Sequence, residues 1–314
     1  MKSLIKDILD IKNIIKVIKN PFLIKNLFKR INYYPGLKFG YSKSLIYKKI
    51  EIKFTTFFAK RKKTFRTFFF DKNLITENPK IYSNFSEKNV ISDDQIKILK
   101  ENGILVIENV LDCNEHLSIK HKIKALIDDE KTKSREKINF VETDDLYKLS
   151  IKYNISNIKN LNNITNKISK LVYGKEVEPD TSIIYTKSLK IPEKTYSGDN
   201  NLHPDRYLPN MKIFYYPFLV DKDSAPFMYA LGSHQINKEY IEYFIENSNF
   251  IFDEENKSSE KFLKRKEIFP VKENSLIIAF TNGFHGRSKF KKDGERTAIF
   301  LQFSKFDMKS LILF

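Results

Sequence analysis

Two histidines and one aspartate form the clearest chemical signal in this sequence. His203 and Asp205 lie two residues apart, just before an apolar, aromatic run at 211–218, and residues at this spacing on an extended chain point to the same face. His285 follows 82 residues later, after a second apolar run. Two imidazoles and one carboxylate are the ligand set that binds Fe(II) and leaves coordination positions open for oxygen chemistry. The three residues are therefore candidates for such a site.

A single arginine completes this signal. Arg296 comes eleven residues after His285, at the start of another apolar run. Its planar guanidinium is suited to binding a carboxylate through two parallel hydrogen bonds. Taken one at a time, the residues have plainer interpretations: His203 and Asp205 as a loop ion pair, and His285 as a buried structural histidine.

The elements that would position these residues change character along the chain. Helical patterns come first, and short strand-like segments separated by turns follow. This order predicts an antiparallel barrel or sandwich flanked by helices. The predicted helices are 92–103, 114–129 and 155–174, and the predicted strands include 104–111, 181–191, 211–220, 225–231, 274–280 and 297–303.

Composition places the chain among globular proteins. It has 314 residues, of which 41% are hydrophobic, and no run reaches the roughly 18 uncharged apolar residues of a membrane span. Cys113 is the sole cysteine, so no intramolecular disulfide can form, and we expect it to be a small buried residue. Charges recur from the first residues, unlike a signal peptide. We expect a cytoplasmic protein.

The positive charge is concentrated near the N-terminus. Residues 1–70 carry a net +15 of the total +17, which leaves +2 for the rest of the chain and argues against a nucleic-acid groove across it. Residues 1–20 show an amphipathic helical pattern, interpreted either as a helix packed on the main domain or as a peripheral contact with an anionic membrane. The stretch 59–70 is interpreted as a second surface contact or a strand. We predict an N-terminal extension at 1–90 and one catalytic domain at 91–314.

The ordered motifs resemble the phytanoyl-CoA dioxygenase family of Fe(II)- and 2-oxoglutarate-dependent oxygenases. The resemblance spans about residues 92–306. It rests on "ENGILVIENVL", "HPD" at 203–205, "SAPFMYALGSH" at 224–234, "FHGR" at 284–287 and "GERTAIFLQF" at 294–303.

The resemblance implies a mainly β fold with flanking helices and a double-stranded β-helix (jelly-roll, cupin-like) core. It implies that His203, Asp205 and His285 hold Fe(II) and that Arg296 binds the distal carboxylate of 2-oxoglutarate. The implied reaction consumes O2, releases succinate and CO2, and hydroxylates a C–H bond of a small organic or lipid-like substrate. Halogenating relatives lack the carboxylate ligand, so Asp205 favours hydroxylation.

One position departs from the family pattern. Many members have serine two residues after the distal histidine, where this chain has Arg287 followed by Ser288. Both are candidates for further contacts with 2-oxoglutarate. Arg206, Tyr207 and Tyr215 are candidates for the substrate pocket, with a plain structural role as the alternative.

The remaining histidines are not interpreted as ligands. His234 ends the "LGSH" turn and is expected to be structural, and His116 and His121 are five apart on a helix, so they do not share a face.

Two other function classes stay open: a non-catalytic jelly-roll binding module, and a nucleic-acid dealkylating dioxygenase. The second typically has another arginine six residues after the co-substrate arginine, where this chain has Gln302.

Overall fold

A computed structural model defines most of the predicted domain. The predicted N-terminal helix at 1–20 lies outside the described residues, as does Arg206, so both predictions stay open. The structure describes residues 56, 59–60, 63–70, 80–84, 91–134, 140–143, 146–188, 202–205, 207, 209–246, 260–291 and 294–303.

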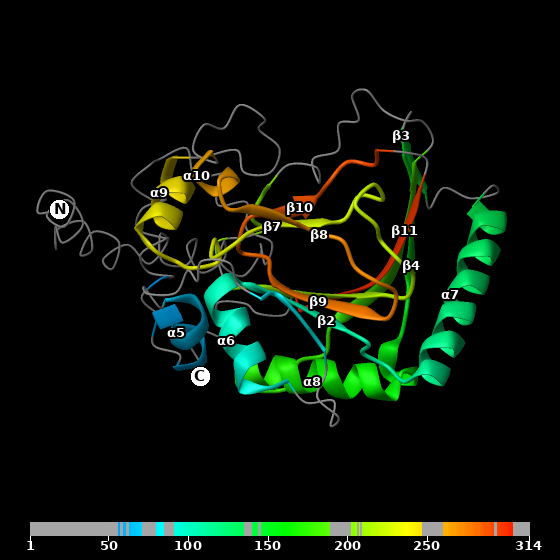
Figure 1. Cartoon of the computed structure of the whole chain (residues 1–314), viewed down its shortest axis with the longest axis horizontal. Coiled ribbons are helices and arrows are strands. Elements are labelled where there is room, and N and C mark those ends of the chain that lie inside the picture. Colours follow the sequence, from blue (N-terminus) through cyan, green and yellow to red (C-terminus); the bar gives the residue numbers. More distant parts are fainter. Residues whose placement is uncertain are drawn as a thin grey trace, which may run out of the picture.

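A large sheet of eight strands runs through the molecule in the order β1-β2-β9-β6-β11-β5-β4-β3 (Figure 1). Neighbouring strands are antiparallel apart from the parallel pair β1–β2. The strands are β1 (Tyr82–Asn84), β2 (Ile104–Glu108), β3 (Phe140–Thr143), β4 (Leu146–Lys152), β5 (Asp180–Ser188), β6 (Met211–Tyr216), β9 (Ser275–Phe280) and β11 (Glu295–Gln302).

A smaller sheet has the order β10-β7-β8. Its strands are β7 (Phe227–Ala230), β8 (Lys266–Phe269) and β10 (His285–Arg287). His203 forms an isolated antiparallel bridge with His285, so the segment around His203 continues this sheet beyond β10.

The chain alternates between the two sheets as it advances. It passes from β5 in the large sheet to the His203 segment in the small one, returns in β6, crosses to β7 and β8, and then visits β9, β10 and β11 in turn. This winding is that of a double-stranded β-helix, so the predicted fold class is confirmed.

Strand alternation gives the large sheet two different faces. In β6, Phe214 and Tyr216 belong to the apolar cluster between the sheets, whereas Ile213 and Tyr215 belong to the cluster on the opposite, outer face. Each predicted strand region contains an observed strand, namely β2 within 104–111, β5 at 181–191 as far as residue 188, β6 within 211–220, β7 within 225–231, β9 within 274–280 and β11 at 297–303.

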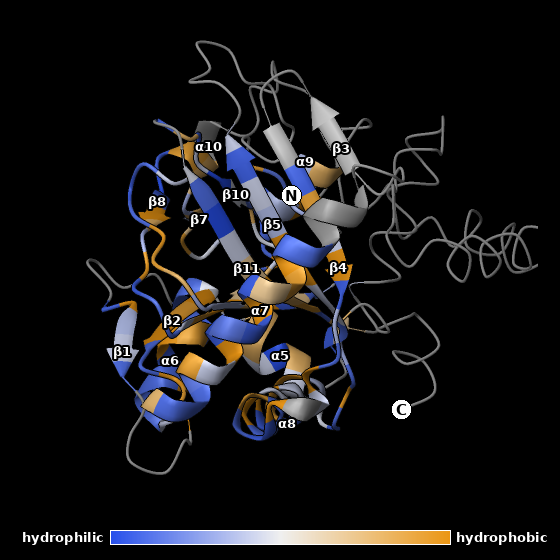
Figure 2. Cartoon of the chain, turned by 90° about the vertical axis from the view of Figure 1, so that its right-hand side faces the viewer, coloured by the Kyte–Doolittle hydropathy of each residue, from blue (hydrophilic) through white to orange (hydrophobic). Residues whose placement is uncertain are grey.

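Helices cover the outer face. Helix α8 (Lys159–Tyr173), preceded by the 3₁₀ turn η2 (Ile155–Asn157), lies within the predicted helix 155–174 and buries an apolar stripe that includes Leu161, Ile164 and Ile168. Helices α6 (Asp93–Asn102) and α7 (Cys113–Ser134) flank it (Figure 1). Both carry hydrophilic and hydrophobic residues side by side, as one-sided burial requires (Figure 2).

Local sequence sets the ends of α6. The Ser92 side chain accepts a hydrogen bond from the Gln95 backbone N–H, and the Gln95 side chain accepts one from the Ser92 N–H, which is a capping box. The helix ends at Gly103, whose φ of 79° favours glycine. The predicted helix at 92–103 is confirmed.

Two expectations near the helices are wrong. Cys113 is exposed at the start of α7 rather than buried, because it lies with its exposed neighbours Asp112 and Asn114 on the outward side of the helix start. Within the stretch 59–70, residues Lys63–Phe69 form helix α5 and not a strand. Phe65, Phe68 and Phe69 are buried in the outer core, and the Phe69 ring lies 4.6 Å from that of Phe280 on β9.

Two further helices, α9 (Lys238–Glu246) and α10 (Glu260–Leu263), pack beside the small sheet (Figure 1). None of the helices in the described part of the chain is both long enough and apolar enough to cross a membrane.

Candidate metal centre

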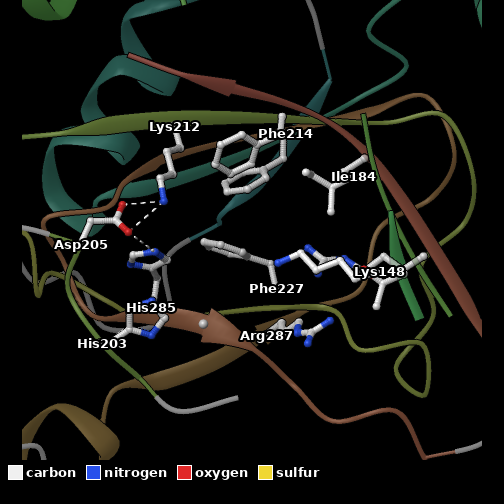
Figure 3. Close-up of a pocket in the computed structure, with 14 residues that line it drawn as sticks. Lys148, Ile184, His203, Asp205, Lys212, Phe214, Phe227, His285 and Arg287 are labelled. Carbon is white, nitrogen blue, oxygen red and sulfur yellow. Dashed lines mark hydrogen bonds and ion pairs between the residues drawn. The ribbon is translucent and has the colours of Figure 1, made fainter. Parts of the chain in front are cut away.

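Backbone pairing brings the three predicted ligands together. The His203 N–H donates to the His285 carbonyl at 2.9 Å, and the His285 N–H donates back to the His203 carbonyl at 3.0 Å. The Asp205 N–H donates to the Thr281 carbonyl at 2.8 Å. As a result, one ligand atom from each of His203, Asp205 and His285 lies within 4.8 Å of the others. Residues far apart in sequence thus form one triad, a term used below for these three side chains (Figure 3).

A backbone carbonyl and a phenylalanine ring orient the imidazole of His285. Its Nδ1 lies 3.0 Å from the Gly283 carbonyl, and a carbonyl can only accept, so Nδ1 carries the proton. The Nε2 atom is then the lone-pair donor, and it lies 3.6 Å from Asp205 Oδ1. The Phe227 ring stacks on the imidazole at 5.9 Å between centroids. A hydrogen bond from Nδ1 to a backbone carbonyl is typical of histidines that bind metals through Nε2.

Asp205 is held by a lysine and an amide. The Lys212 ammonium lies 2.8 Å from Oδ1 and 2.7 Å from Oδ2, and the Asn210 side-chain N–H donates to Oδ2 at 3.2 Å. Asn210 also donates to the Thr281 hydroxyl at 2.7 Å. These contacts fix the carboxylate on the side of the cavity that the two imidazoles share.

Electrostatics favour the protonation states that bind a cation. Burial lowers the pKa of His285 to about 3, an effect that nearby Asp205 only partly opposes, so the imidazole is neutral. Burial alone would raise the pKa of Asp205, but the Lys212 ammonium beside it outweighs burial and holds that pKa below its usual range. A neutral imidazole and an ionised carboxylate are the forms that coordinate metals.

The triad opens into a cavity of about 270 Å³ between the two sheets (Figure 3). Its apolar lining comes from both sheets, and its cationic lining includes two residues predicted from sequence, Arg287 and Arg296. The lining residues are Lys148, Ile184, Thr186, His203, Asp205, Lys212, Phe214, Phe227, His285, Gly286, Arg287, Arg296, Ala298 and Phe300.

Arg296 enters the cavity from β11. One of its terminal N–H groups donates to the Tyr216 hydroxyl at 3.0 Å, and the guanidinium carbon lies 5.6 Å from the Tyr216 ring centroid. Strand pairing places Arg296 opposite Thr186 on β5, which is itself opposite Lys148 on β4. These three side chains therefore form one row along the cavity wall.

Other predicted site residues differ in their placement. Arg287 is buried on β10 and lines the cavity, whereas Ser288 does not. Tyr207 and Tyr215 do not line it either, contrary to the prediction. The Tyr207 hydroxyl contacts Thr56, and the Tyr215 hydroxyl lies 2.8 Å from His116 Nδ1 on the outer face of the sheet. Strand alternation explains Tyr215, since Phe214 and Tyr216 take the inward positions.

His234 is buried away from the cavity. Its Nε2 lies 3.0 Å from the Lys100 carbonyl, its ring stacks on Phe280, and burial lowers its pKa to about 3. These contacts join the turn after β7 to the end of α6, as a structural histidine would. His116 is buried and His121 exposed, so the two do not form a metal site.

Sequence reasoning missed Lys148, Thr186 and Lys212. A signal existed for Lys212, which is the one charged residue in the otherwise apolar or aromatic run of β6. Lys148 and Thr186 carry no comparable signal, because their place at the cavity depends on the pairing of β4 with β5.

No family model matches the chain, and no curated protein matches it. Solved structures with a similar shape do exist. The apoform of EctD from S. alaskensis aligns with a TM-score of 0.48 and 16% identity, over 72% of this chain and 81% of EctD. SnoK, an alpha ketoglutarate dependent carbocyclase from nogalamycin biosynthesis, aligns with a TM-score of 0.45 and 14% identity, over 70% of this chain and 86% of SnoK.

HygX from Streptomyces hygroscopicus, solved with nickel, 2-oxoglutarate and hygromycin B, aligns with a TM-score of 0.42 and 13% identity, over 67% of this chain and 86% of HygX. At such TM-scores and identities, the similarities assign neither an activity nor a family to this chain. Its resemblance to phytanoyl-CoA dioxygenases stays a prediction from sequence, and its function must be argued from its own residues.

Proposed function

We propose that this chain is an Fe(II)- and 2-oxoglutarate-dependent oxygenase that hydroxylates a small organic substrate. The observation that carries the proposal is the convergence of His203, Asp205 and His285 on a cavity whose wall also presents Arg296. Two imidazoles and one carboxylate leave room on a metal for other ligands. A guanidinium on the same cavity supplies a partner for the far carboxylate of the co-substrate.

The donor set fits iron. Its nitrogen and oxygen atoms suit a borderline divalent metal, and the Gly283 carbonyl fixes the His285 tautomer with Nε2 as the donor. With iron, 2-oxoglutarate and O2 bound, the group would supply the oxidising chemistry, with succinate and CO2 as by-products. The protein's part is to hold the iron through His203, Asp205 and His285 and to place the apolar side chains of the cavity wall beside it.

Arg296 would orient the co-substrate. The Tyr216 hydroxyl and ring hold its guanidinium in one place, so little side-chain entropy is lost when a carboxylate binds. Arg287 stands where many family members have serine, so the contacts around the co-substrate differ from the family pattern in at least this position.

Hydroxylation is the outcome that Asp205 favours. A carboxylate in the ligand set occupies the coordination position that a halide takes in halogenating relatives. Asn210 and Lys212 support this carboxylate directly, which is consistent with a ligand role.

One observation favours a second candidate function, a binding module that works without metal. The Lys212 ammonium contacts both oxygens of Asp205 and could neutralise the carboxylate in place of a metal cation. Both functions use the same cavity, but they differ in whether a metal binds to the triad.

Metal and co-substrate binding separates the two candidates. Purified anaerobically, the full chain should bind about one Fe(II), because the triad provides one site. 2-Oxoglutarate should then bind to the iron-loaded protein more tightly than to the metal-free protein. His203→Ala should abolish iron binding, while Lys152→Ala on the exposed part of β4 should not. A wild-type chain that binds no divalent metal in this titration would favour the binding module.

A further inference from the structure

Lys212 places a positive charge directly beside the triad. Its Nζ atom lies 2.8 Å from Oδ1 and 2.7 Å from Oδ2 of Asp205, and the lysine side chain is 12% exposed. The same Nζ atom lies 5.2 Å from the centroid of the Phe300 ring. The carboxylate and the ring therefore hold the ammonium in one place, at the end of the cavity where the triad lies (Figure 3).

Stability alone does not explain a lysine at this position. The desolvation of two buried charges offsets much of their attraction, and replacing both members of such a pair by apolar residues is often neutral or stabilising. The other inward residues of β6, Phe214 and Tyr216, pack in the apolar cluster between the sheets. The pair of Lys212 and Asp205 is therefore better explained by what its charges do to the ligands of the cavity.

The two oxygens of Asp205 have different surroundings. Oδ1 lies 3.6 Å from His285 Nε2, whereas Oδ2 accepts a hydrogen bond from the Asn210 side chain at 3.2 Å. Oδ1 is therefore the oxygen placed to bind a metal together with the imidazoles. A metal at Oδ1 would share that oxygen with the Lys212 ammonium, and two cations on one carboxylate repel each other. Lys212 thus opposes the binding of a metal by itself.

The same charge has the opposite effect on the co-substrate. 2-Oxoglutarate is a dianion, and Asp205 is the one acidic residue among the described residues that line the cavity. The ammonium adds one unit of positive charge to a site in which a divalent metal already exceeds the charge of its carboxylate ligand. A dianion binds such a site more tightly than it would bind the same site without the ammonium.

We propose that Lys212 is a positioning residue that shifts the site from binding iron alone to binding iron together with 2-oxoglutarate. Its charge weakens the hold of the triad on the metal and strengthens the hold of the metal-loaded site on the co-substrate. Iron occupancy then depends more on the co-substrate than it would in a triad without the ammonium. This inference rests on the proposed oxygenase function, because the iron and the 2-oxoglutarate are those of that function.

Two calorimetric titrations of the full chain test the inference. The metal-free protein is titrated anaerobically with Fe(II), and the iron-saturated protein is then titrated with 2-oxoglutarate. Lys212→Met should bind Fe(II) about ten- to a hundred-fold more tightly than the wild type, and its iron-loaded form should bind 2-oxoglutarate more weakly by a similar factor. A merely structural role for Lys212 predicts no such pair of opposite shifts.

Further variants separate charge from packing. Lys212→Arg keeps the charge and should stay within about three-fold of the wild type in both titrations. Lys212→Gln removes the charge but keeps a polar side chain, so it should shift both affinities in the same directions as Lys212→Met and replaces that variant if it does not fold. Lys152→Met, at an exposed lysine of β4, is the matched control and should change neither affinity. Thermal melts of each metal-free variant identify any loss of folded protein.

Three outcomes would overturn the inference while leaving the oxygenase function intact. These are unchanged affinities in both uncharged variants, weaker binding of iron as well as 2-oxoglutarate by folded Lys212→Gln, and the same shifts in Lys212→Arg as in Lys212→Met. The oxygenase function itself fails at an earlier step, if the wild-type chain binds no iron.

Discussion

The space between the two sheets has a filled end and an open end. At the filled end, around β2, β9, β7 and β8, large apolar side chains occupy the interior and no residue of the triad is present. At the open end, around β4, β5, β11 and β10, the interior holds the cavity and its charged lining. The filled end is built from Ile104, Val106, Tyr229, Phe269, Val271 and Ile277.

Strand β6 is the boundary between the two ends, and it shows how the difference arises. Its inward residues Phe214 and Tyr216 pack in the apolar cluster, while the inward Lys212 reaches Asp205. The backbone pairing is continuous through β6, with β9 on one side and β11 on the other. The same fold therefore makes either a packed core or a reaction chamber, depending on which inward positions carry polar side chains.

Two buried histidines show that one residue type can serve either a chemical or a structural role. Burial lowers the pKa of both His285 and His234 to about 3. His285 directs Nε2 toward Asp205 and the cavity, whereas Nε2 of His234 lies against the Lys100 carbonyl. A depressed pKa thus marks burial in both, and geometry alone distinguishes the candidate ligand from the structural residue.

The largest expected effect comes from exchanging these two histidines for alanine. His285→Ala should abolish Fe(II) binding and succinate release, because it removes one of three ligands, while changing the fold little. His234→Ala should instead destabilise the fold by about 2–4 kcal/mol through lost packing and a lost hydrogen bond, and its folded fraction should still bind iron. Metal analysis and urea unfolding measure the two effects. Full activity of His285→Ala would disprove the ligand assignment.

The next effect concerns the cavity wall. Arg296→Lys keeps the charge but loses the planar fork, so the 2-oxoglutarate concentration needed for half-maximal succinate release should rise about ten- to a hundred-fold. Iron content should be unchanged, since Arg296 is not a ligand. Arg287→Ala is the comparison, because Arg287 also lines the cavity and is the second guanidinium among its described lining residues. A strong shift in Arg287→Ala with none in Arg296→Lys would show that the co-substrate arginine was chosen wrongly.

The sequence predicted the parts of this site that depend on local spacing. The His203/Asp205 pair precedes an apolar strand, His285 follows one and Arg296 begins one, and the family resemblance supplied their order. The cap residues Ser92 and Gly103 were equally readable, because capping acts over a few residues.

What could not be predicted depends on pairing between distant strands. Lys148 reaches the cavity because β4 pairs with β5, and Tyr215 is excluded from it because Tyr216 takes the inward position. A shift of one residue in register would exchange these faces. Helix α5 was missed for a related reason: its three phenylalanines look like a strand until α8 and β9 are present to bury them.

The two histidines also predict an acid-sensitive fold. In the unfolded chain each imidazole gains a proton as the pH falls below about 6.5, but in the folded chain each stays neutral down to about 3. The unfolded state then binds more protons, so stability decreases as the pH falls through this window. Between pH 6.5 and 5 the loss is about 2 kcal/mol for each histidine.

The pKa of His116 is lowered as well, so it contributes in the same direction. Urea midpoints at pH 7, 6 and 5 for the metal-free chain measure the total loss. His234→Gln should lower stability at pH 7 but lose less of it on acidification, because one titrating group is gone. An unchanged pH dependence in this variant would contradict the assignment of a neutral, buried His234.

The smallest expected effect compares two tyrosine hydroxyls, one at the filled end and one on the boundary strand β6. At the filled end, the Tyr229 hydroxyl donates to the Phe280 carbonyl at 2.7 Å, and that carbonyl also accepts from the Gly283 N–H at 2.9 Å. Tyr229→Phe leaves the carbonyl with one partner, so the loss should be about 1 kcal/mol, or about 2–4 °C in Tm, with no change in the 2-oxoglutarate titration.

On the boundary strand β6, Tyr216→Phe removes the acceptor that orients Arg296, whose guanidinium would then sample more rotamers before a carboxylate binds. We expect the 2-oxoglutarate requirement to rise by about three- to ten-fold while Tm changes little, since the Tyr216 ring and its packing remain. Each of the two variants, Tyr229→Phe and Tyr216→Phe, loses one hydroxyl oxygen. Comparing them therefore distinguishes an effect on stability from an effect on co-substrate binding. If Tyr216→Phe lowers Tm as much as Tyr229→Phe and leaves the titration unchanged, then Tyr216 belongs to the filled end, and the boundary lies between β6 and β11 rather than within β6.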